Sequence, residues 1–320
     1  MSDTDITAAL PASIATRIVS AGVKDGHAIV VVDVAGMDET ARSEIEAAVR
    51  DLVGARQEVE DVRVVLTAEK AARRIIAVGS GKGGVGKSTL TANLAIVLKG
   101  LGHAVGLVDA DIYGPSQPTI LGNRGQRPEL AGEKLVPVPN RWGVPVLSMG
   151  HLVEEGAAIA WRGPMAGNAL GQLVDAEWGP VDTLLVDLPP GTGDVQLTML
   201  QKFKPAGAVL VSTPQDLALI DAARAGSLFD QADVPIIGLV ENMAGYACPH
   251  CGEISDPFGA GGVEQAAEQL KLPFLGRIPL AMAIREGSDA GTPPAAQGGE
   301  LAAPFEAIAR KVSQWLGASG

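Results

Sequence analysis

From residue 75 onward, apolar runs rich in valine, isoleucine and leucine alternate with stretches of helical spacing. Strands that are apolar on both faces and separated by helices are typical of a parallel sheet covered by helices on both sides. In such sheets ligands bind at the carboxyl ends of the strands, where this sequence gathers Gly, Ser, Asp and Asn. The expected strands are residues 75–80, 104–109, 183–188, 207–213 and 236–242, with a weaker one at 274–280.

Residues 1–66 have a different pattern, which predicts a small separate α/β unit in the order helix–strand–helix–strand. Its clearest strands are residues 29–34 and 61–67, and residues 39–53 place apolar side chains at helical spacing. This unit contains no cysteine and no visible catalytic constellation. A polar stretch at residues 67–74 is the expected linker to the larger domain, residues 75–320.

The composition excludes some classes of function. The chain of 320 residues has a formal net charge of −12 and shows no cluster of lysine and arginine. Because such clusters bind the phosphate backbone, we expect no nucleic-acid partner. The N-terminal stretch MSDTDITAAL lacks the cationic start of a secretory signal, and no apolar run reaches the ~18 residues of a membrane span. The sequence thus favours a cytoplasmic protein with no membrane partner.

The stretch GSGKGGVGKST, residues 79–89, matches the phosphate-loop pattern G-x-x-x-x-G-K-[ST] between a strand and a helix. Its backbone N–H groups and the helix N-terminus would bind phosphates, Lys87 would reach the β- and γ-phosphates, and Ser88 would bind Mg²⁺. The same letters fit the dinucleotide pattern G-x-G-x-x-G, but a hydride cofactor needs neither Lys87 nor Ser88. The predicted nucleotide-binding residues here are Gly81, Gly83, Gly84, Val85, Gly86, Lys87, Ser88 and Thr89.

Carboxylates follow two further strands. Asp109 and Asp111 belong to VDADIYGPS, and Asp187 ends the apolar run of LLVDLPPGTGD. Alone, each could belong to an ordinary turn, but beside a phosphate loop they predict a catalytic centre. We expect Asp109 and Asp187 to help Ser88 hold Mg²⁺, and Asp111 to orient the attacking water.

The only two cysteines, Cys248 and Cys251, lie within YACPHCGE. The two thiolates of one chain cannot complete a site with four ligands. Two chains related by a two-fold axis can, because together they supply four thiolates. A zinc knuckle bridging two chains is an alternative, because CPxCG also forms zinc-binding turns. A thiol–disulfide centre is disfavoured, since that class starts a helix at the first cysteine and here Pro257 and several glycines follow. His250 is expected to be a solvated turn residue.

Over about residues 74–290 the sequence resembles the deviant Walker A ATPases of the MinD/ParA/nitrogenase-iron-protein group. Within that group it is similar to the Mrp (ApbC-like) iron–sulfur cluster carriers. The N-terminal unit resembles the small MIP18-like domain found in many of these proteins. The matching stretches are GKGGVGKST, VDADIYGPS, WRGPMAGNAL, LLVDLPPGTGDVQLT, VSTPQDLALIDA, GLVENMAGYACPHCG and FGAGG.

This resemblance implies a P-loop NTPase fold and a homodimer that binds ATP and Mg²⁺. It implies that the second loop lysine, Lys82, crosses the dimer interface to the partner's nucleotide, and that Asn242 contacts adenine. It also implies a labile [4Fe–4S] cluster held between subunits by Cys248 and Cys251 of each chain, although the sequence itself leaves [2Fe–2S] open. Trp161 and Arg162 belong to a matching stretch, but the sequence gives them no role.

The leading hypothesis is therefore an ATPase that receives a cluster from a scaffold and transfers it to apo iron–sulfur proteins. A zinc-bridged P-loop ATPase and a MinD/ParA-like positioning ATPase are the alternatives. A positioning ATPase would need a basic amphipathic tail, and the C-terminal apolar residues from Leu301 to Leu316 do have helical spacing. Only Arg310 and Lys311 lie near them as cations, so we expect this helix to pack on the domain.

Overall fold

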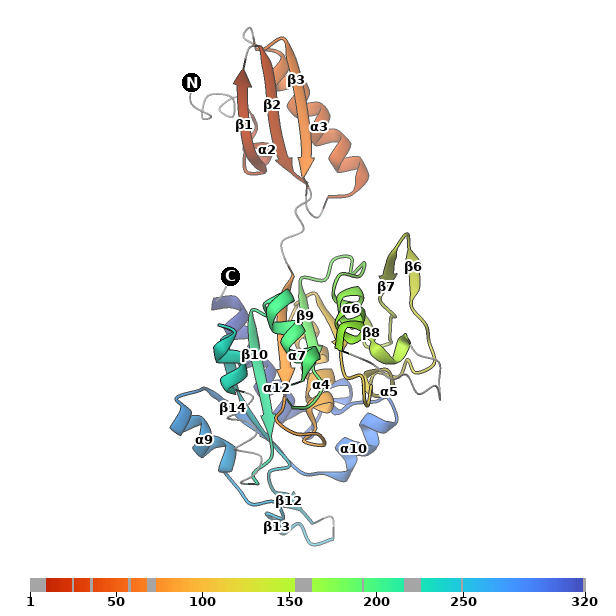
Figure 1. The fold of residues 1–320 in the computed structure, drawn as a ribbon, viewed down its shortest axis with the longest axis vertical. Coiled ribbons are helices and arrows are strands. Elements are labelled where there is room, and N and C mark those ends of the chain that lie inside the picture. Colours follow the sequence, from red (N-terminus) through yellow and green to blue (C-terminus); the bar gives the residue numbers. More distant parts are fainter. Residues whose placement is uncertain are drawn as a thin grey trace. The chain divides into compact units, whose positions relative to one another are not determined.

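The computed structural model divides the chain into two compact units, Met1–Arg73 and Arg74–Gly320 (Figure 1). Each unit has its own core and is described by itself. The structure describes residues 10–24, 26–34, 37–56, 59–67, 73–152, 163–191, 193–215, 226–248 and 250–318.

The N-terminal unit is a three-stranded sheet in the order β1–β2–β3, in which β1 and β2 are antiparallel and β2 and β3 are parallel. The expected order of its elements was wrong, because an additional strand, β1, precedes β2. The sequence IVSAGVK did not indicate a strand, since Ser20 and Gly22 interrupt its apolar run. The elements are α2 (Ala12–Ala15), β1 (Ile18–Lys24), β2 (His27–Asp33), α3 (Glu39–Gly54) and β3 (Asp61–Thr67).

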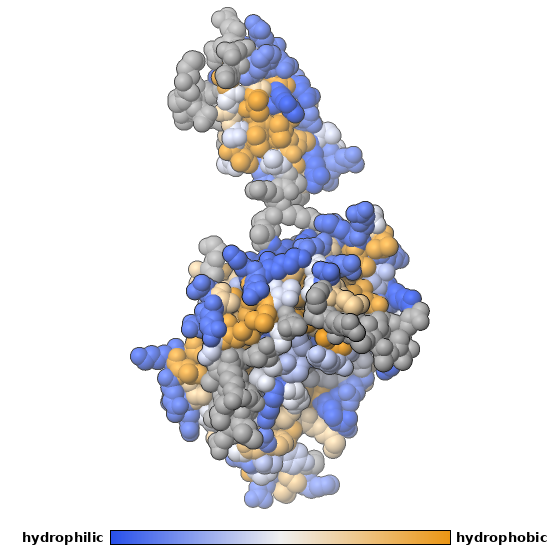
Figure 2. Space-filling model, viewed as in Figure 1, coloured by the Kyte–Doolittle hydropathy of each residue, from blue (hydrophilic) through white to orange (hydrophobic). Residues whose placement is uncertain are grey.

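One face of this sheet packs against α3. Alternate residues of β2, Ala28, Val30 and Val32, are fully buried with Val49 of the helix. The N-terminus of α3 is capped by Asp38, whose carboxylate accepts a hydrogen bond from the Ala41 N–H at 2.8 Å. Apolar residues also gather on the surface of this unit (Figure 2). The unit therefore has a core of its own. None of the predicted site residues belongs to it, since all of them follow residue 80.

The larger unit is built on a parallel sheet in the strand order β14–β11–β10–β4–β9–β5–β8 within the described residues. The six expected strands are all present, with ends shifted by up to two residues. The seventh, β8, was missed because it has only three residues. The strands are β4 (Arg74–Gly79), β5 (Val105–Asp109), β8 (Val146–Ser148), β9 (Thr183–Asp187), β10 (Gly207–Ser212), β11 (Ile236–Asn242) and β14 (Phe274–Ile278).

The sheet is buried on both faces, as the continuous apolar runs predicted. In β4, Ile75 and Ala77 belong to one core cluster while Ile76 and Val78 belong to the other. The first cluster includes residues of α6, α7 and α9, and the second includes residues of α4, α10 and α12. These helices are α4 (Lys87–Gly100), α6 (Gly163–Val174), α7 (Asp194–Thr198), α9 (Gly262–Leu270), α10 (Met282–Asp289) and α12 (Ala303–Ala318).

Short elements complete the unit. The hairpin of β12 and β13 carries the cysteine motif. The remaining elements are α5 (Gln117–Ile120), β6 (Glu129–Ala131), β7 (Lys134–Val136), η1 (Met149–His151), η2 (Met199–Phe203), β12 (Tyr246–Ala247), β13 (Ile254–Ser255) and α11 (Pro294–Gln297).

The strands reach into the expected linker at both ends. Thr67, which the sequence placed both in a strand and in the linker, ends β3, and Arg74, which was assigned to the linker, begins β4, because each continues the ladder of its sheet. The C-terminal helix packs on the domain as expected: Phe305, Ile308 and Val312 of α12 are fully buried. Among the described helices, none has the length and apolar character required to cross a membrane.

Candidate nucleotide site and cysteine hairpin

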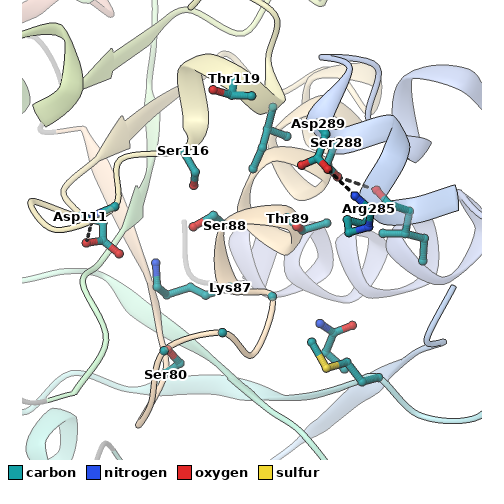
Figure 3. Close-up of a pocket in the computed structure, with 18 of the residues that line it drawn as sticks. Ser80, Lys87, Ser88, Thr89, Asp111, Ser116, Thr119, Arg285, Ser288 and Asp289 are labelled. Atoms are coloured by element: carbon teal, nitrogen blue, oxygen red, sulfur yellow. Dashed lines mark hydrogen bonds and ion pairs between the residues drawn. The ribbon is translucent and has the colours of Figure 1, made fainter. Parts of the chain in front are cut away.

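A pocket of about 620 Å³ opens at the carboxyl edge of the sheet. The glycine-rich loop forms one wall, the segment after β5 forms another, and the end of β11 together with α10 closes the far end. Figure 3 shows Asp111, Ser116 and Ser88 toward one end of this pocket and Arg285 and Asp289 toward the other. The strand-end rule therefore located the pocket correctly.

The glycine-rich loop is held in its curved shape by its glycines and by Asn242. Gly86 has φ +84°, in the left-handed region, and caps the N-terminus of α4. A Cβ atom on Gly86 would lie 2.0 Å from Nδ2 of Asn242. The same Nδ2 donates a hydrogen bond to the Val85 carbonyl at 2.7 Å. Only glycine therefore allows the loop to close against the end of β11.

Lys87 is buried and paired with a carboxylate of its own chain. Its Nζ lies 2.5 Å from Oδ1 of Asp187, and the two side chains are 6% and 0% exposed. Thr91 Oγ1 donates to the same carboxylate oxygen at 3.3 Å. Phosphate oxygens entering the loop would therefore meet a lysine whose position is already fixed by Asp187.

Gln117, at the start of α5, was not identified from the sequence. Its Nε2 donates to Asp187 Oδ2 at 2.8 Å and to the Ser88 carbonyl at 3.0 Å. It thereby connects the end of β9 with the first turn of α4. The local sequence SQPT gives no signal for this role, because the contacts depend entirely on the tertiary arrangement.

Asp109 lies in a buried polar chain behind the pocket. Its Oδ2 accepts hydrogen bonds from Ser148 Oγ at 2.9 Å and from the Gln117 N–H at 3.1 Å. Burial, followed by the charge of Asp187, raises the pKa of Asp109 to about 7. The Ser148 N–H donates to Nδ1 of His151 at 3.2 Å, and burial lowers the pKa of His151 to about 4.

Asp111 occupies a different position, on the wall of the pocket itself. Its Oδ1 accepts hydrogen bonds from the N–H groups of Tyr113 at 3.0 Å and Gly114 at 3.2 Å. These bonds orient the carboxylate within a tight turn and, among the described residues, leave Oδ2 without a donor. The sequence grouped Asp109 and Asp111 together, but the first is fully buried and only the second lines the pocket.

The far end of the pocket is more apolar. Met243, Pro279, Leu280 and Ile284 line it together with Asn242. Asn242 Nδ2 donates to the Val85 carbonyl, and within the described residues no donor is bonded to Oδ1 of this amide. On α10, Arg285 Nη1 donates to Asp289 Oδ2 at 2.9 Å, as Figure 3 also shows.

Lys82 has a separate environment from Lys87. Its Nζ donates to Oε1 of Gln215 at 3.1 Å. Lys87 lines the pocket, whereas Lys82 is not among the described lining residues. The two lysines of one loop thus have different partners, Gln215 for Lys82 and Asp187 for Lys87.

The cysteine motif forms the exposed hairpin of β12 and β13. The Cys248 N–H donates to the Glu253 carbonyl at 2.9 Å, and the Gly252 N–H donates to the Cys248 carbonyl at 2.8 Å. Cys248 is half-buried and Cys251 is exposed, and both are free thiols. The backbone N–H groups of His250 and Cys251, together with the Cys251 side chain, lower the pKa of the Cys248 thiol.

The hairpin does not bring a complete ligand set together in one chain. Within the described residues, no group of three or more His, Cys, Asp or Glu side chains is placed to hold a metal ion. Trp161 and Arg162 lie outside the described residues. Of the predicted nucleotide-binding residues, the pocket is lined by Gly83, Gly84, Gly86, Lys87, Ser88, Thr89 and Asn242, whereas Gly81 and Val85 are not among its described lining residues. The two cysteines lie on the separate hairpin of β12 and β13.

The parallel sheet, the glycine-rich loop between β4 and α4, and the buried Lys87–Asp187 pair define a P-loop NTPase. Residues 71–313 match the ParA family, described as NUBPL iron-transfer P-loop NTPase. The chain belongs to this family.

Among its relatives, an iron–sulfur protein required for NADH dehydrogenase in mitochondria, from Arabidopsis thaliana, is 52% identical over 222 residues, covering 68% of this chain and 70% of the relative. An iron–sulfur cluster carrier protein from Haemophilus influenzae is 45% identical over 252 residues, covering 78% of this chain and 68% of the relative. A solved nucleotide-binding protein from Archaeoglobus fulgidus, in complex with ADP, superposes with a TM-score of 0.60 at 41% identity, covering 68% of this chain and 86% of that one.

Proposed function

We propose that the chain is a homodimeric ATPase that carries an iron–sulfur cluster and transfers it to apo-proteins. The observation that carries this proposal is the exposed hairpin, in which two cysteines supply thiolates but no further ligand joins them among the described residues. The names of the relatives from Haemophilus influenzae and Arabidopsis thaliana support the choice of cargo.

The hairpin suits a transferable cluster for two reasons. Its backbone favours the thiolate form of Cys248, which is the form that binds iron. Its exposure would let a second copy of the chain add another pair of thiolates, completing four ligands for a bridging [4Fe–4S] cluster. A site shared between subunits can release its cargo when the subunits separate or rotate.

In the nucleotide pocket, we assign the β- and γ-phosphates of ATP to the loop N–H groups and to Lys87. The hydroxyl of Ser88 lines the pocket, and the carboxylates of Asp187 and Asp109 lie buried behind it, which fits a Mg²⁺ site with water between the metal and the carboxylates. Bound Mg²⁺ would neutralise charge on the phosphates. Asp111, on the pocket wall, would orient the attacking water.

We assign the adenine to the apolar end of the pocket, beside Met243 and Pro279. The anchored amide of Asn242 offers Oδ1 there as an acceptor, because Nδ2 is used by the Val85 carbonyl. The adenine amino group can donate to this oxygen, whereas the carbonyl group of guanine would face it with a second acceptor. This arrangement favours ATP.

We assign Lys82 a role across the dimer interface. Its hydrogen bond to Gln215, which is not among the described pocket residues, supports this assignment over a simple contribution to local positive potential. A cation supplied by a second subunit stabilises charge on the transferred phosphoryl group, as arginine fingers do. ATP hydrolysis would then depend on dimer formation, and dimer formation would also complete the cluster site.

In this proposal the cargo comes from a cluster scaffold and goes to apo iron–sulfur proteins in the cytoplasm, and ATP hydrolysis resets the carrier. The N-terminal unit is proposed to be MIP18-like. A positioning ATPase is less well supported, since Phe305, Ile308, Val312 and Leu316 of α12, which could have formed a membrane-binding face, are buried in the domain.

The test is anaerobic reconstitution of the full chain with ferrous iron, sulfide and ATP, followed by size determination and iron, sulfide and zinc analysis. We expect a brown dimer with about four iron per two chains that restores activity to an apo iron–sulfur enzyme. Cys248→Ala and Cys251→Ala should each lose the iron. A chain that stays monomeric under these conditions, or that retains stoichiometric zinc and excludes iron, would refute the proposal.

A further inference from the structure

The hydrogen bond between Lys82 and Gln215 directs this lysine toward a residue of its own chain. The ammonium group lies 3.1 Å from the Gln215 amide oxygen. We propose that Gln215 is a positioning residue, which keeps the Lys82 side chain on its own subunit. When a second copy of the chain binds, the phosphates of its nucleotide replace Gln215 as the partner of Lys82. This inference rests on the proposed cross-subunit role of Lys82. It adds that Gln215 affects the protein concentration at which Lys82 starts to act on the nucleotide of a second subunit.

The backbone of Lys82 is fixed independently of its side chain. The Ser80 hydroxyl donates to the Lys82 carbonyl at 2.9 Å, and the Gly191 N–H donates to the Ser80 carbonyl at 3.0 Å. The loop segment that carries Lys82 is therefore tied to the turn after β9. Because its backbone is held, the lysine has a restricted set of positions for its Nζ.

The backbone before Gln215 is fixed as well, by its contacts with the start of α9. Gln215 follows β10 by way of Thr213, which is buried, and Pro214. Pro214 packs so closely on the start of α9 that a Cβ atom at Gly262 would lie 2.7 Å from the Pro214 carbonyl oxygen. The close approach at Gly262 fixes the position from which the Gln215 side chain extends.

The start of α9 is itself anchored to the sheet through Glu241. This fully buried carboxylate accepts hydrogen bonds from the Val263 N–H at 2.9 Å, from the Gly261 N–H at 3.3 Å and from Arg277 Nε at 3.0 Å. A carboxylate at a helix N-terminus is favourable electrostatically. Gln215 therefore projects from a base connected to β11, and its contact with Lys82 joins two held backbones.

The chemistry of the contact suits a reversible hold. A glutamine amide is a neutral acceptor, so its net bond with an ammonium group near solvent contributes modestly. A phosphate oxygen carries a full charge and binds the same ammonium more strongly. The nucleotide of a second subunit would therefore bind Lys82 in preference to Gln215. A glutamate at position 215 would bind Lys82 more strongly and so make this exchange less favourable.

The experiment measures ATP turnover per subunit against protein concentration, at saturating ATP, for the wild type, Gln215→Ala and Gln215→Glu. Each dimer releases two contacts, so we expect Gln215→Ala to lower the half-saturating protein concentration about fivefold. Gln215→Glu should raise it about tenfold, because an ion pair must be broken. Turnover at saturating protein concentration should stay within about twofold for both variants.

Lys82→Ala, alone and combined with each Gln215 variant, separates the two proposals. We expect Lys82→Ala to remove the rise of turnover with protein concentration, and the Gln215 substitutions to have no further effect in that background. If Lys82→Ala behaves as wild type, the cross-subunit role fails. If Lys82→Ala is impaired but both Gln215 variants match wild type, or Gln215→Ala raises the half-saturating concentration, the positioning role fails while the dimer proposal stands.

A folding control uses binding of a non-hydrolysable ATP analogue by dilute, monomeric protein. Gln215 is not among the described pocket residues, so a correctly folded variant should bind the analogue with an affinity within about twofold of wild type. A general structural defect would weaken this binding for both variants. The opposite shifts expected for alanine and glutamate cannot arise from such a defect.

Discussion

The nucleotide pocket and the cysteine hairpin differ in how far one chain completes them. At the pocket, the charged side chains of Lys87 and Asp187 are buried and paired with each other, and Gln117 and Thr91 add hydrogen bonds to Asp187. In the hairpin, both thiols are free and at least partly accessible. The pocket holds its lysine and its buried carboxylate in place before any ligand arrives, whereas the hairpin presents two thiols that no further metal ligand joins among the described residues.

This difference shows which part of the proposed cycle each region controls. A preformed pocket can bind nucleotide in a single subunit with little reorganisation. A site with two thiolates depends on a second copy or another donor of ligands to hold a cluster. Under the proposed function, binding of ATP would therefore precede completion of the cluster site, and the connection between them would be the dimer.

The largest expected effect comes from breaking the pocket at Lys87. Lys87→Ala should reduce ATP turnover by at least about a hundredfold, because it removes a preorganised cation from the phosphates. It should also lower the free energy of unfolding by about 3–5 kcal/mol, because Asp187 would remain as an unpaired buried charge. Turnover assays and urea denaturation measure these two effects separately.

Two controls separate the loss of the Lys87–Asp187 pair from a general effect of removing a lysine. Lys99→Ala, at an exposed position near the end of the same helix, should change neither quantity appreciably. The double variant Lys87→Ala, Asp187→Asn should recover most of the lost stability, since the buried charge is gone, but none of the turnover. If Lys87→Ala alone keeps normal stability, the Lys87–Asp187 pair is not the compensated buried pair that the geometry indicates.

The sequence predicted the parallel sheet well because most of its strands contain nearly continuous apolar runs, which a strand buried on both faces requires. It failed for β1 and β8. In β1, Ser20 and Gly22 break the pattern, and the three residues of β8 are too few to have one. Both strands are defined by pairing with a neighbour, which a local pattern does not contain.

The candidate site divides in a similar way. The loop residues and Asp187 were predictable because phosphate binding requires glycines, a lysine and a carboxylate at fixed places relative to strand ends. Gln117 and Gln215 were not, because an amide can serve at a surface or in a turn equally well. Their contacts with Asp187 and Lys82 join residues 70 and 133 positions apart, and only the folded chain brings them together.

A smaller effect should come from acid, which acts on the buried polar chain behind the pocket. The folded pKa of His151 is about 4, below its ordinary 6.5. The unfolded chain therefore binds more protons between pH 6.5 and 4, and His151 lowers the stability as pH falls through this window. Asp109, with a pKa raised from 3.8 to about 7, acts in the opposite direction, since its folded form binds more protons between pH 4 and 7.

The variant His151→Asn isolates the histidine contribution. Asparagine can still accept from the Ser148 N–H, so the local cap is preserved. Relative to wild type, this variant should gain about 2–3 kcal/mol in free energy of unfolding at pH 4.5 compared with pH 7. Urea denaturation at the two pH values provides the measurement. An equal pH dependence in both proteins would mean that His151 is not buried in its neutral form.

The smallest expected effect concerns the cysteine hairpin. It tests whether the hairpin is folded before a partner or iron binds. The backbone N–H groups of His250 and Cys251 lower the pKa of Cys248 only while the hairpin is folded. Alkylation of Cys248 by iodoacetamide should therefore have its pH midpoint below that of the same cysteine in urea, and its rate at neutral pH should be a few-fold higher. The midpoint is the decisive quantity, since partial burial can slow the reaction at every pH without moving it. Mass spectrometry of metal-free protein follows each cysteine, and coincident midpoints in folded and unfolded chains would mean that the thiolates are organised only when a second subunit or a cluster arrives.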